Sequence, residues 1–192
     1  MIIIYLLVYV FIIFFFFIER RLRKDNDAKT LEKSKHDKRT TDIIGLSFLV
    51  AILLLIITPL FNYYKIGFIN SGLRFNFVGL VIILTGLIIR ITAFITLGRF
   101  YTRTLKITEN HVVVSNGIYK YIRHPGYLGT ILLFIGASIS MGNIISIIII
   151  SACILPTYIY RIKTEEEMLI EAFGDRYKIY AKKTKKLIPF IW

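Results

Sequence analysis

The chain alternates long apolar runs with blocks of charged residues. A helix needs about 20 mostly apolar residues, within a usual range of roughly 17–25, to cross the hydrocarbon core of a bilayer. By this criterion the sequence predicts an all-α integral membrane protein with about five transmembrane helices, at residues 2–18, 43–61, 77–97, 126–140 and 144–160.

The fourth run is short, and together with the fifth it predicts a tight helical hairpin that turns at residues 141–143, a stretch without charge. Small side chains in this hairpin, Gly129, Gly136, Ala137 and Ser138, are expected to let its two helices approach closely. The fifth helix is expected to continue beyond the membrane into residues 161–180.

The first apolar run is predicted to be a retained span. A secretory signal carries its positive charges before the apolar core and small residues after it. Here Arg20, Arg21, Arg23 and Lys24 follow the core, and no small-residue cleavage site is present. We therefore expect the N-terminus to face outward.

Charge is distributed unevenly between the two sides of these spans. Segments 19–42, 99–125 and 161–192 hold 22 of the 25 Lys and Arg residues and all 12 acidic residues, whereas the opposite loop holds only Lys65 and Arg74. Because cytoplasmic loops carry an excess of Lys and Arg, the polar machinery is expected at the cytoplasmic face. The net charge of +13 lies in blocks between apolar runs, so it indicates no nucleic-acid partner.

The composition supports a single membrane domain spanning residues 1–192. The apolar fraction is 56% and the mean hydropathy is +0.66, whereas soluble domains are nearer ~45–50% apolar. The single cysteine, Cys153, allows no disulfide within the chain and supports no cysteine-based metal site. His124 has no second ligand at metal-site spacing, so no metal is predicted.

Arg90 is an ionisable residue inside the third span, and such residues mark functional sites by default. One interpretation is that it pairs with a buried carboxylate such as Glu165 and contacts substrate. The other is that its side chain snorkels to the cytoplasmic interface, because it lies only eight residues before Arg99.

The first polar motif, residues 111–129, reads HVVVSNGIYKYIRHPGYLG. A β-branched stretch and an Asn-Gly turn predict a small ordered loop, which leads to Pro125 at the first position of a helix. The free N–H groups of that helix start, together with Arg123 and His124, would favour an anion. Alternatively, Arg123 and His124 only contact lipid headgroups.

The second motif, residues 161–180, reads RIKTEEEMLIEAFGDRYKIY. Arg161 and Glu165 are four residues apart and so share one helix face. An ordinary surface ion pair is the alternative interpretation. However, both residues lie just beyond an apolar run, at the depth of Arg123 and His124, and this indicates a site. The tail that follows is cationic and then aromatic, which predicts docking on membrane lipids through Phe190 and Trp192.

The two motifs, in this order and spacing, resemble the isoprenylcysteine carboxyl methyltransferase family over residues 97–191. The resemblance implies S-adenosylmethionine as methyl donor, bound at the cytoplasmic face without a Rossmann domain. The chain itself has no G-x-G-x-x-G after a strand. It also implies variable N-terminal spans (residues 1–61) and a catalytic region comprising spans three to five and the C-terminus (residues 77–192).

The resemblance also implies roles for individual residues. Arg161 would contact the substrate and, with Glu165, form the catalytic pair. The donor-binding positions fall on Thr104, His111, Val112, Val113, Val114, Tyr119, His124, Pro125, Gly126, Tyr127 and Glu165. At Thr104 some members of the family carry a longer amide side chain, which puts that contact in question.

The expected reaction is carboxyl or O-methylation of a lipophilic, isoprenylcysteine-like or prenylated substrate. A carboxylate is already ionised at neutral pH, so it needs no general base. Two alternatives stay open: an N-methyltransferase for phospholipid amines, and a non-enzymatic membrane binding protein with the same fold. The Ile, Lys, Phe and Asn content indicates an A+T-rich genome and a bacterial cell membrane, which favours a free lipid or secondary metabolite as substrate. The sequence carries no signal of an oligomeric state.

Overall fold

The computed structural model describes residues 1–22, 37, 39–69, 72–102, 104–105, 107 and 112–188. Within these ranges the protein is all-α, as predicted. The helices are α1 (Ile2–Leu22), α3 (Thr40–Tyr63), α4 (Gly72–Leu97), α5 (Pro125–Met141), α6 (Ile144–Phe173) and α7 (Asp175–Lys183), with short 3-10 helices η1 (Gly98–Phe100) and η2 (Gly117–Lys120).

The five long helices coincide with the five predicted spans. Four of them, α1, α3, α4 and α6, are long and apolar enough to cross a membrane, and α5 is a shorter apolar helix of 17 residues. The chain is therefore an integral membrane protein. As predicted, α6 extends beyond its apolar run and carries Arg161 and Glu165 on its polar end. It does not continue through residue 180, because it ends at Phe173 and Gly174, at φ +55°, turns the chain into the separate helix α7.

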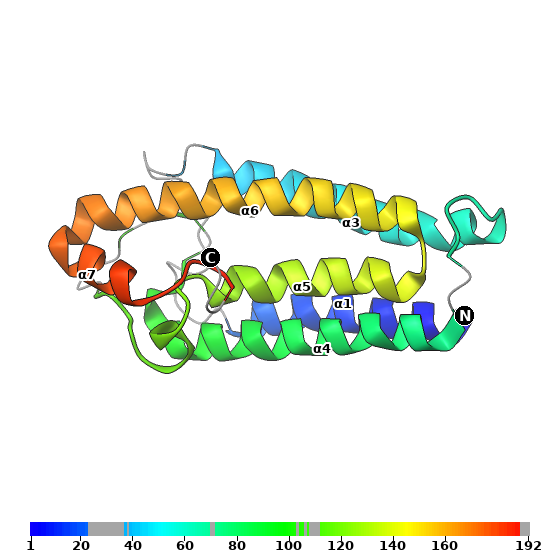
Figure 1. Ribbon diagram of the computed structural model, residues 1–192, viewed down its shortest axis with the longest axis horizontal. Helices are drawn as coiled ribbons and strands as arrows, with labels where there is room; N and C mark the ends of the chain where they lie inside the picture. Colours follow the sequence, from blue (N-terminus) through cyan, green and yellow to red (C-terminus); the bar gives the residue numbers. More distant parts are fainter. Residues whose placement is uncertain are drawn as a thin grey trace.

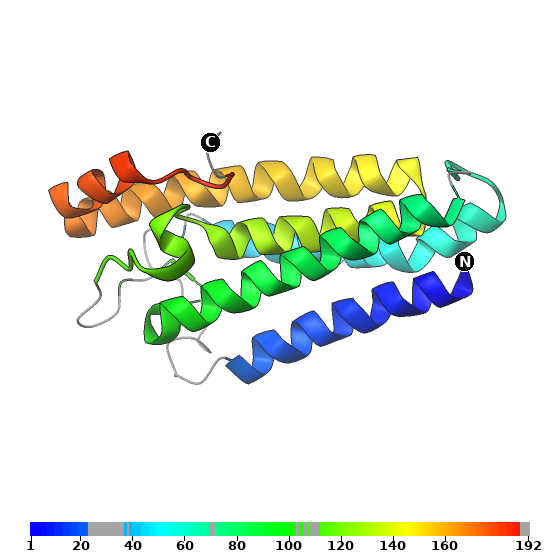
Figure 2. The same cartoon turned by 60° about the horizontal axis from the view of Figure 1, so that its bottom comes forward.

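The long helices lie side by side along one axis (Figure 1). Helix α3 packs along α6 and α4 packs along α5, while α5 contacts each of the other four long helices. Figure 2 shows α1 at one edge of the bundle and α6 at the other, with α4 and α5 between them. The shortest long helix is thus the central one, which explains why most of its residues are buried.

Glycines set the close approach of α4 and α5. A Cβ atom built at Gly86 would lie 2.6 Å from the carbonyl oxygen of Gly129, and one at Gly129 would lie 2.6 Å from that of Gly86. Likewise, a Cβ at Gly136 would lie 2.9 Å from the Gly79 carbonyl oxygen. The prediction that Gly129 and Gly136 serve the α5–α6 hairpin is therefore wrong, because they face α4.

The α5–α6 turn itself is where the sequence predicts it. Gly142 ends α5 at φ +66°, and the side chain of Asn143 caps α6 by accepting a hydrogen bond from the Ser146 N–H at 3.1 Å. The Asn143 amide also donates to the side chain of Asn62 and to the Ile66 carbonyl, both at 2.8 Å. These bonds tie the turn to the end of α3.

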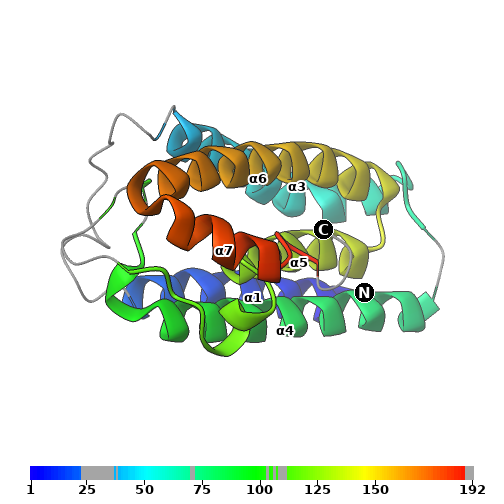
Figure 3. The ribbon, with the colours of Figure 1, turned by 60° about the vertical axis from the view of Figure 1, so that its left-hand side comes forward.

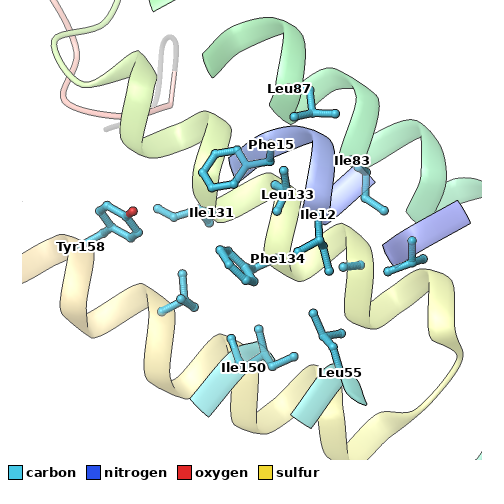
Figure 4. Close-up of a cluster of buried hydrophobic side chains, with 14 of the residues drawn as sticks. Ile12, Phe15, Leu55, Ile83, Leu87, Ile131, Leu133, Phe134, Ile150 and Tyr158 are labelled. Atoms are coloured by element: carbon cyan, nitrogen blue, oxygen red, sulfur yellow. The ribbon is translucent and has the colours of Figure 1, made fainter. Parts of the chain in front are cut away.

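A continuous apolar core fills the bundle (Figure 4). Phe134 of α5 is fully buried and contacts Phe15 of α1 and Phe48 of α3, with ring centroids 6.4 and 4.9 Å apart. Leu55 and Ile150 close the core from α3 and α6. Aromatic contacts of this kind join helices that are distant in sequence.

The charged segments gather at one end of the bundle. The loop after α4, η2, the start of α5, the polar end of α6 and α7 all lie there, whereas the N-terminus and the α5–α6 turn lie at the other end (Figure 1). Helix α7 folds back from the end of α6 across the bundle (Figure 3). This arrangement brings the two predicted motifs together.

Candidate active site

A cavity of about 260 Å³ opens at the charged end of the bundle. Residues from all five long helices and from α7, together with residues of the loop and turn before α5, line it. One part of its wall is apolar, with Phe15, Phe48 and Phe94 as members, and the other part is polar. Such a lining suits a molecule with both a charged and an apolar portion.

The polar wall is built on Arg161, Tyr127 and Glu165. Arg161 Nε donates to the Tyr127 hydroxyl at 3.2 Å, and that hydroxyl donates to Glu165 Oε2 at 2.5 Å. Because the two α6 residues share a helix face, the Tyr127 hydroxyl from α5 sits between them. The structure thus brings together three of the predicted site residues.

His124 extends this wall. Its ring stacks on that of Tyr127 with centroids 5.6 Å apart and an interplanar angle of 6°. Its Nδ1 lies 3.7 Å from Glu165 Oε2 and its Nε2 lies 3.5 Å from Glu166 Oε1. The side chain is 3% exposed and lines the cavity. This buried position replaces the alternative in which His124 contacts lipid headgroups.

Arg90 lines the cavity and is paired, so it does not snorkel to the interface. Its Nε donates to Glu19 Oε1 at 2.6 Å, and its Nη2 donates to the Tyr101 hydroxyl at 3.0 Å. The carboxylate partner is therefore Glu19 of α1, which corrects the expectation of Glu165. Gly126 makes room for this arrangement, because a Cβ there would lie 2.9 Å from Arg90 Nη1.

Arg123 binds the C-terminal segment, which comprises residues 181–188. Its Nε donates to Glu166 Oε1 at 2.6 Å, and its Nη1 donates to the carbonyl oxygens of Ala181 at 2.8 Å and Thr184 at 2.5 Å. Lys186 adds a second cation to Glu166, with Nζ 3.2 Å from Oε2. The interpretation of Arg123 as a lipid anchor is wrong, since a mostly buried network holds it.

Several backbone N–H groups around the start of α5 bond within the protein, while Gly126 in its first turn lines the cavity. The N–H of Arg123 donates to the Lys185 carbonyl at 2.8 Å, and that of His124 donates to the Lys186 carbonyl at 3.0 Å. The N–H groups of Tyr127 and Leu128 both donate to the His124 carbonyl. Pro125 has no N–H to offer. The C-terminal segment thus satisfies donors that sequence alone leaves unassigned.

The remaining predicted positions fall into three groups. Thr104, Val112, Val113, Val114, Tyr119 and Gly126 line the cavity with the residues above. Pro125 is buried at the first turn of α5 and is absent from the cavity lining. His111, Phe190 and Trp192 lie outside the described residues.

Sequence reasoning missed several polar residues of the site. Tyr177 of α7 lines the cavity, is 3% exposed, and its hydroxyl has no hydrogen-bond partner among the described residues. Burial raises the pKa of this hydroxyl, and the charges of Glu166 and Glu165 raise it further. It is therefore a neutral donor. Its presence within the second motif was the available signal, but only the fold of α7 shows that it points inward.

Asp37 is a second residue that sequence reasoning missed. It precedes α3, is 1% exposed, and accepts a hydrogen bond from Arg161 Nη1 at 2.8 Å. No pattern in the mixed-charge connector distinguishes it from its neighbours. Among the described residues, no group of His, Cys, Asp or Glu side chains has an arrangement that could hold a metal ion.

The sequence model of the isoprenylcysteine carboxyl methyltransferase (ICMT) family matches residues 78–171, which include Arg90, Tyr127, Arg161 and Glu165. This chain is therefore similar to that family over its central and C-terminal helices. The match covers α5, α6 and most of α4, and it leaves α1 and α3 outside.

Similar proteins carry names consistent with the family. A probable protein-S-isoprenylcysteine O-methyltransferase of Oryza sativa subsp. indica is 33% identical over 118 residues, which are 60% of this chain and 62% of the relative. The protein-S-isoprenylcysteine O-methyltransferase of Schizosaccharomyces pombe is 32% identical over 133 residues, or 68% of this chain and 56% of the relative. The chain thus spans less than two thirds of the length of these curated relatives.

A solved structure shares the fold. The eukaryotic intramembrane Ras methyltransferase, isoprenylcysteine carboxyl methyltransferase, superposes with a TM-score of 0.57 at 28% sequence identity. The superposition covers 82% of this chain and 55% of that one. The two proteins therefore share a helical fold over the part that superposes.

Proposed function

We propose that this chain is an S-adenosylmethionine-dependent methyltransferase that forms a methyl ester on a lipophilic, isoprenylcysteine-like carboxylate at the cytoplasmic face of a bacterial membrane. One observation carries the proposal. The family-matched side chains of His124, Tyr127, Arg161 and Glu165 converge on a single cavity that also has an apolar wall.

The residues of the cavity fit S-adenosylmethionine as a donor. Glu165 supplies a carboxylate for a cationic group, and it lies in the cavity wall beside the packed rings of Tyr127 and Tyr158. The buried hydroxyl of Tyr177 has no hydrogen-bond partner among the described residues, and a polar ligand would supply one. Val112, Val113, Val114 and Tyr119 would hold the less polar part of the donor.

The donor supplies, when bound, a methyl group made electrophilic by a sulfonium sulfur. The chain's own residues have the task of alignment, because displacement at a methyl group requires the nucleophile and the leaving group in line. Arg161 would hold the substrate carboxylate through its planar guanidinium, which suits that group better than an ammonium does. No side chain needs to remove a proton, since a carboxylate is ionised at neutral pH.

The apolar wall gives the substrate its second point of attachment. Phe15, Phe48 and Phe94 give the cavity an apolar surface. Burial there of an alkyl or prenyl chain would contribute about 25 cal/mol for each Å² removed from water. Arg90, held by Glu19 and Tyr101, also lines the cavity and would contact the polar part of the substrate.

The proposal is tested by incubating purified protein with S-[methyl-³H]adenosylmethionine and three acceptors in parallel: N-acetyl-S-farnesylcysteine, a long-chain alkylphenol and phosphatidylethanolamine. We expect base-labile label on the farnesylcysteine. Arg161→Gln should abolish that label, whereas Lys163→Gln, which removes an exposed cation from the same helix, should not. Label on phosphatidylethanolamine alone, or no donor binding by calorimetry, would overturn the proposal.

A further inference from the structure

Arg161 forms an ion pair with Asp37, a carboxylate that belongs to neither sequence motif. Its Nη1 donates to Asp37 Oδ1 at 2.8 Å, to Thr40 Oγ1 at 2.5 Å and to Thr41 Oγ1 at 3.2 Å. These three residues precede or begin α3, more than 100 positions from Arg161 in the chain. They also lie outside residues 78–171, the stretch that the family model matches.

Asp37 is itself firmly fixed. Thr40 Oγ1 donates to its Oδ1 at 3.1 Å, Thr41 Oγ1 donates to the same atom at 2.7 Å, and the Thr41 N–H donates to Oδ2 at 3.3 Å. The Thr40 N–H closes the turn on the Asp37 carbonyl at 2.7 Å. The carboxylate thus caps the start of α3 while it binds Arg161.

The position of Asp37 decides between two roles. A carboxylate that occupied the substrate's place would line the cavity and would have to leave when substrate arrives. Arg161 and Thr41 line the cavity, but Asp37 is absent from its lining and is 1% exposed. Because it has four hydrogen bonds to α3, it is a fixed support and not a displaceable occupant.

We propose that Asp37, through its ion pair with Arg161, is a positioning residue that orients the guanidinium toward the substrate carboxylate. This inference rests on the proposed function, in which Arg161 binds that carboxylate. Arg161 Nη1 is committed to Asp37 and the threonines, and its Nε is committed to Tyr127. Two of its nitrogens are thus fixed, which sets the plane of the guanidinium in the cavity.

The proposal predicts a loss of discrimination between ligands. Wild-type protein is expected to bind N-acetyl-S-farnesylcysteine more tightly than its carboxamide, because only the former carries a charge for Arg161. In Asp37→Asn we expect this preference to fall roughly tenfold, since a misoriented guanidinium loses a charge-assisted hydrogen bond. Affinity for S-adenosylmethionine should stay within about twofold, since Asp37 is absent from the cavity lining.

The experiment is isothermal titration calorimetry in detergent with N-acetyl-S-farnesylcysteine and with its carboxamide. Asp37→Glu is the conservative variant expected to restore the preference. Restoring the charge should recover part of the preference. In an Arg161→Gln background, Asp37→Asn should have no further effect on it. If Asp37 had a purely structural role, Asp37→Asn would instead weaken the binding of the acid and of the carboxamide equally. If Asp37→Asn does not fold, Asp37→Ser replaces it.

Different outcomes overturn different claims. A wild-type protein that binds the acid and the amide equally well contradicts the proposed carboxylate substrate. A wild-type preference that survives in folded Asp37→Asn or Asp37→Ser contradicts the positioning role of Asp37 alone. Equal loss of affinity for both ligands, with the preference intact, also overturns it.

Discussion

Each charged side chain around the cavity has a partner from a distant part of the chain. Arg161 pairs with Asp37, Arg90 with Glu19, and Arg123 with Glu166. Removing one member of a buried ion pair leaves the other uncompensated, at a cost of about 3–5 kcal/mol. At the residue scale, single substitutions in the site therefore have to be compared with matched controls that report folding.

Tyr177 offers a substitution that separates binding from folding. We expect Tyr177→Phe to weaken binding of S-adenosylmethionine by roughly threefold to tenfold, because one hydrogen bond contributes about 1 kcal/mol. The fold should not be destabilised, since the hydroxyl has no partner among the described residues. Calorimetric titration measures the first effect and thermal unfolding the second. Tyr121→Phe, at an exposed tyrosine outside the cavity lining, is the control, and equal affinities for all three proteins would contradict the prediction.

Asp37 should make stability depend on pH in acid. Burial alone would raise the pKa of this carboxyl, but hydrogen bonds from Thr41 and the charge of Arg161 outweigh burial and lower its pKa below the usual value. A lowered pKa contributes stability above the unfolded value of about 3.9, and this contribution disappears as the pH falls through the folded value. The difference in melting temperature between wild type and Asp37→Asn should therefore be largest near neutrality and shrink below about pH 4. A difference that stays constant with pH would contradict this.

At the scale of elements, the site depends on how α5 is held. Close packing on α4 fixes the helix along its length, and the C-terminal segment fixes its start through the Arg123 and His124 N–H groups. The Tyr180 hydroxyl adds a bond of 2.8 Å to the Tyr119 carbonyl in η2. As a result, α7 and the residues after it serve as part of the wall that presents His124 and Tyr127.

The α4–α5 contact can be tested with a single methyl group. We expect Gly86→Ala to destabilise the protein by about 1–3 kcal/mol, because the new Cβ would lie 2.6 Å from the Gly129 carbonyl oxygen and force the helices apart. Gly45→Ala in α3 meets nothing within 4 Å and should stabilise by up to about 1 kcal/mol through helix propensity. Thermal unfolding in detergent compares the two. Equal melting temperatures would show that the interface tolerates separation.

At the scale of the whole molecule, polarity is divided between two ends. Exposed cations of α7 and the residues after it, including Lys178, Lys182, Lys183 and Lys185, lie at the cavity end. The α5–α6 turn and the loop after α3 lie at the opposite end, where hydrogen bonds of the Asn143 side chain connect them. This separation agrees with the positive-inside count and places the cavity at the proposed cytoplasmic face.

The orientation can be measured directly. In a Cys153→Ser background, we expect Lys178→Cys to react with a membrane-impermeant maleimide in inverted vesicles and not in intact spheroplasts. Tyr64→Cys, an exposed position at the other end, should show the reverse pattern. Labelling of both positions from the same side would contradict the orientation.

The length of the apolar runs was sufficient to predict the five long helices. All five spans and the turn at residues 141–143 have the positions that the apolar runs indicate, because a membrane-spanning helix needs about 20 mostly apolar residues. The break between α6 and α7 at Gly174 was not predicted. The site residues Tyr127, Arg161, Glu165 and His124 were also reachable, since two recognisable motifs carry them. The partner of Arg90 was not, because Glu19 lies 71 residues away and nothing in its local sequence distinguishes it.

The amino-acid sequence alone thus determined the fold class, the five long apolar helices, the charged segments and the family motifs, all of which depend on local composition and spacing. Only the tertiary structure decided which helix the glycines face, that the C-terminal segment satisfies the start of α5, and that Asp37, Glu19 and Tyr177 belong to the site. Those features depend on contacts between residues tens to more than a hundred positions apart. Such contacts follow from the packing of helices, which no local pattern encodes.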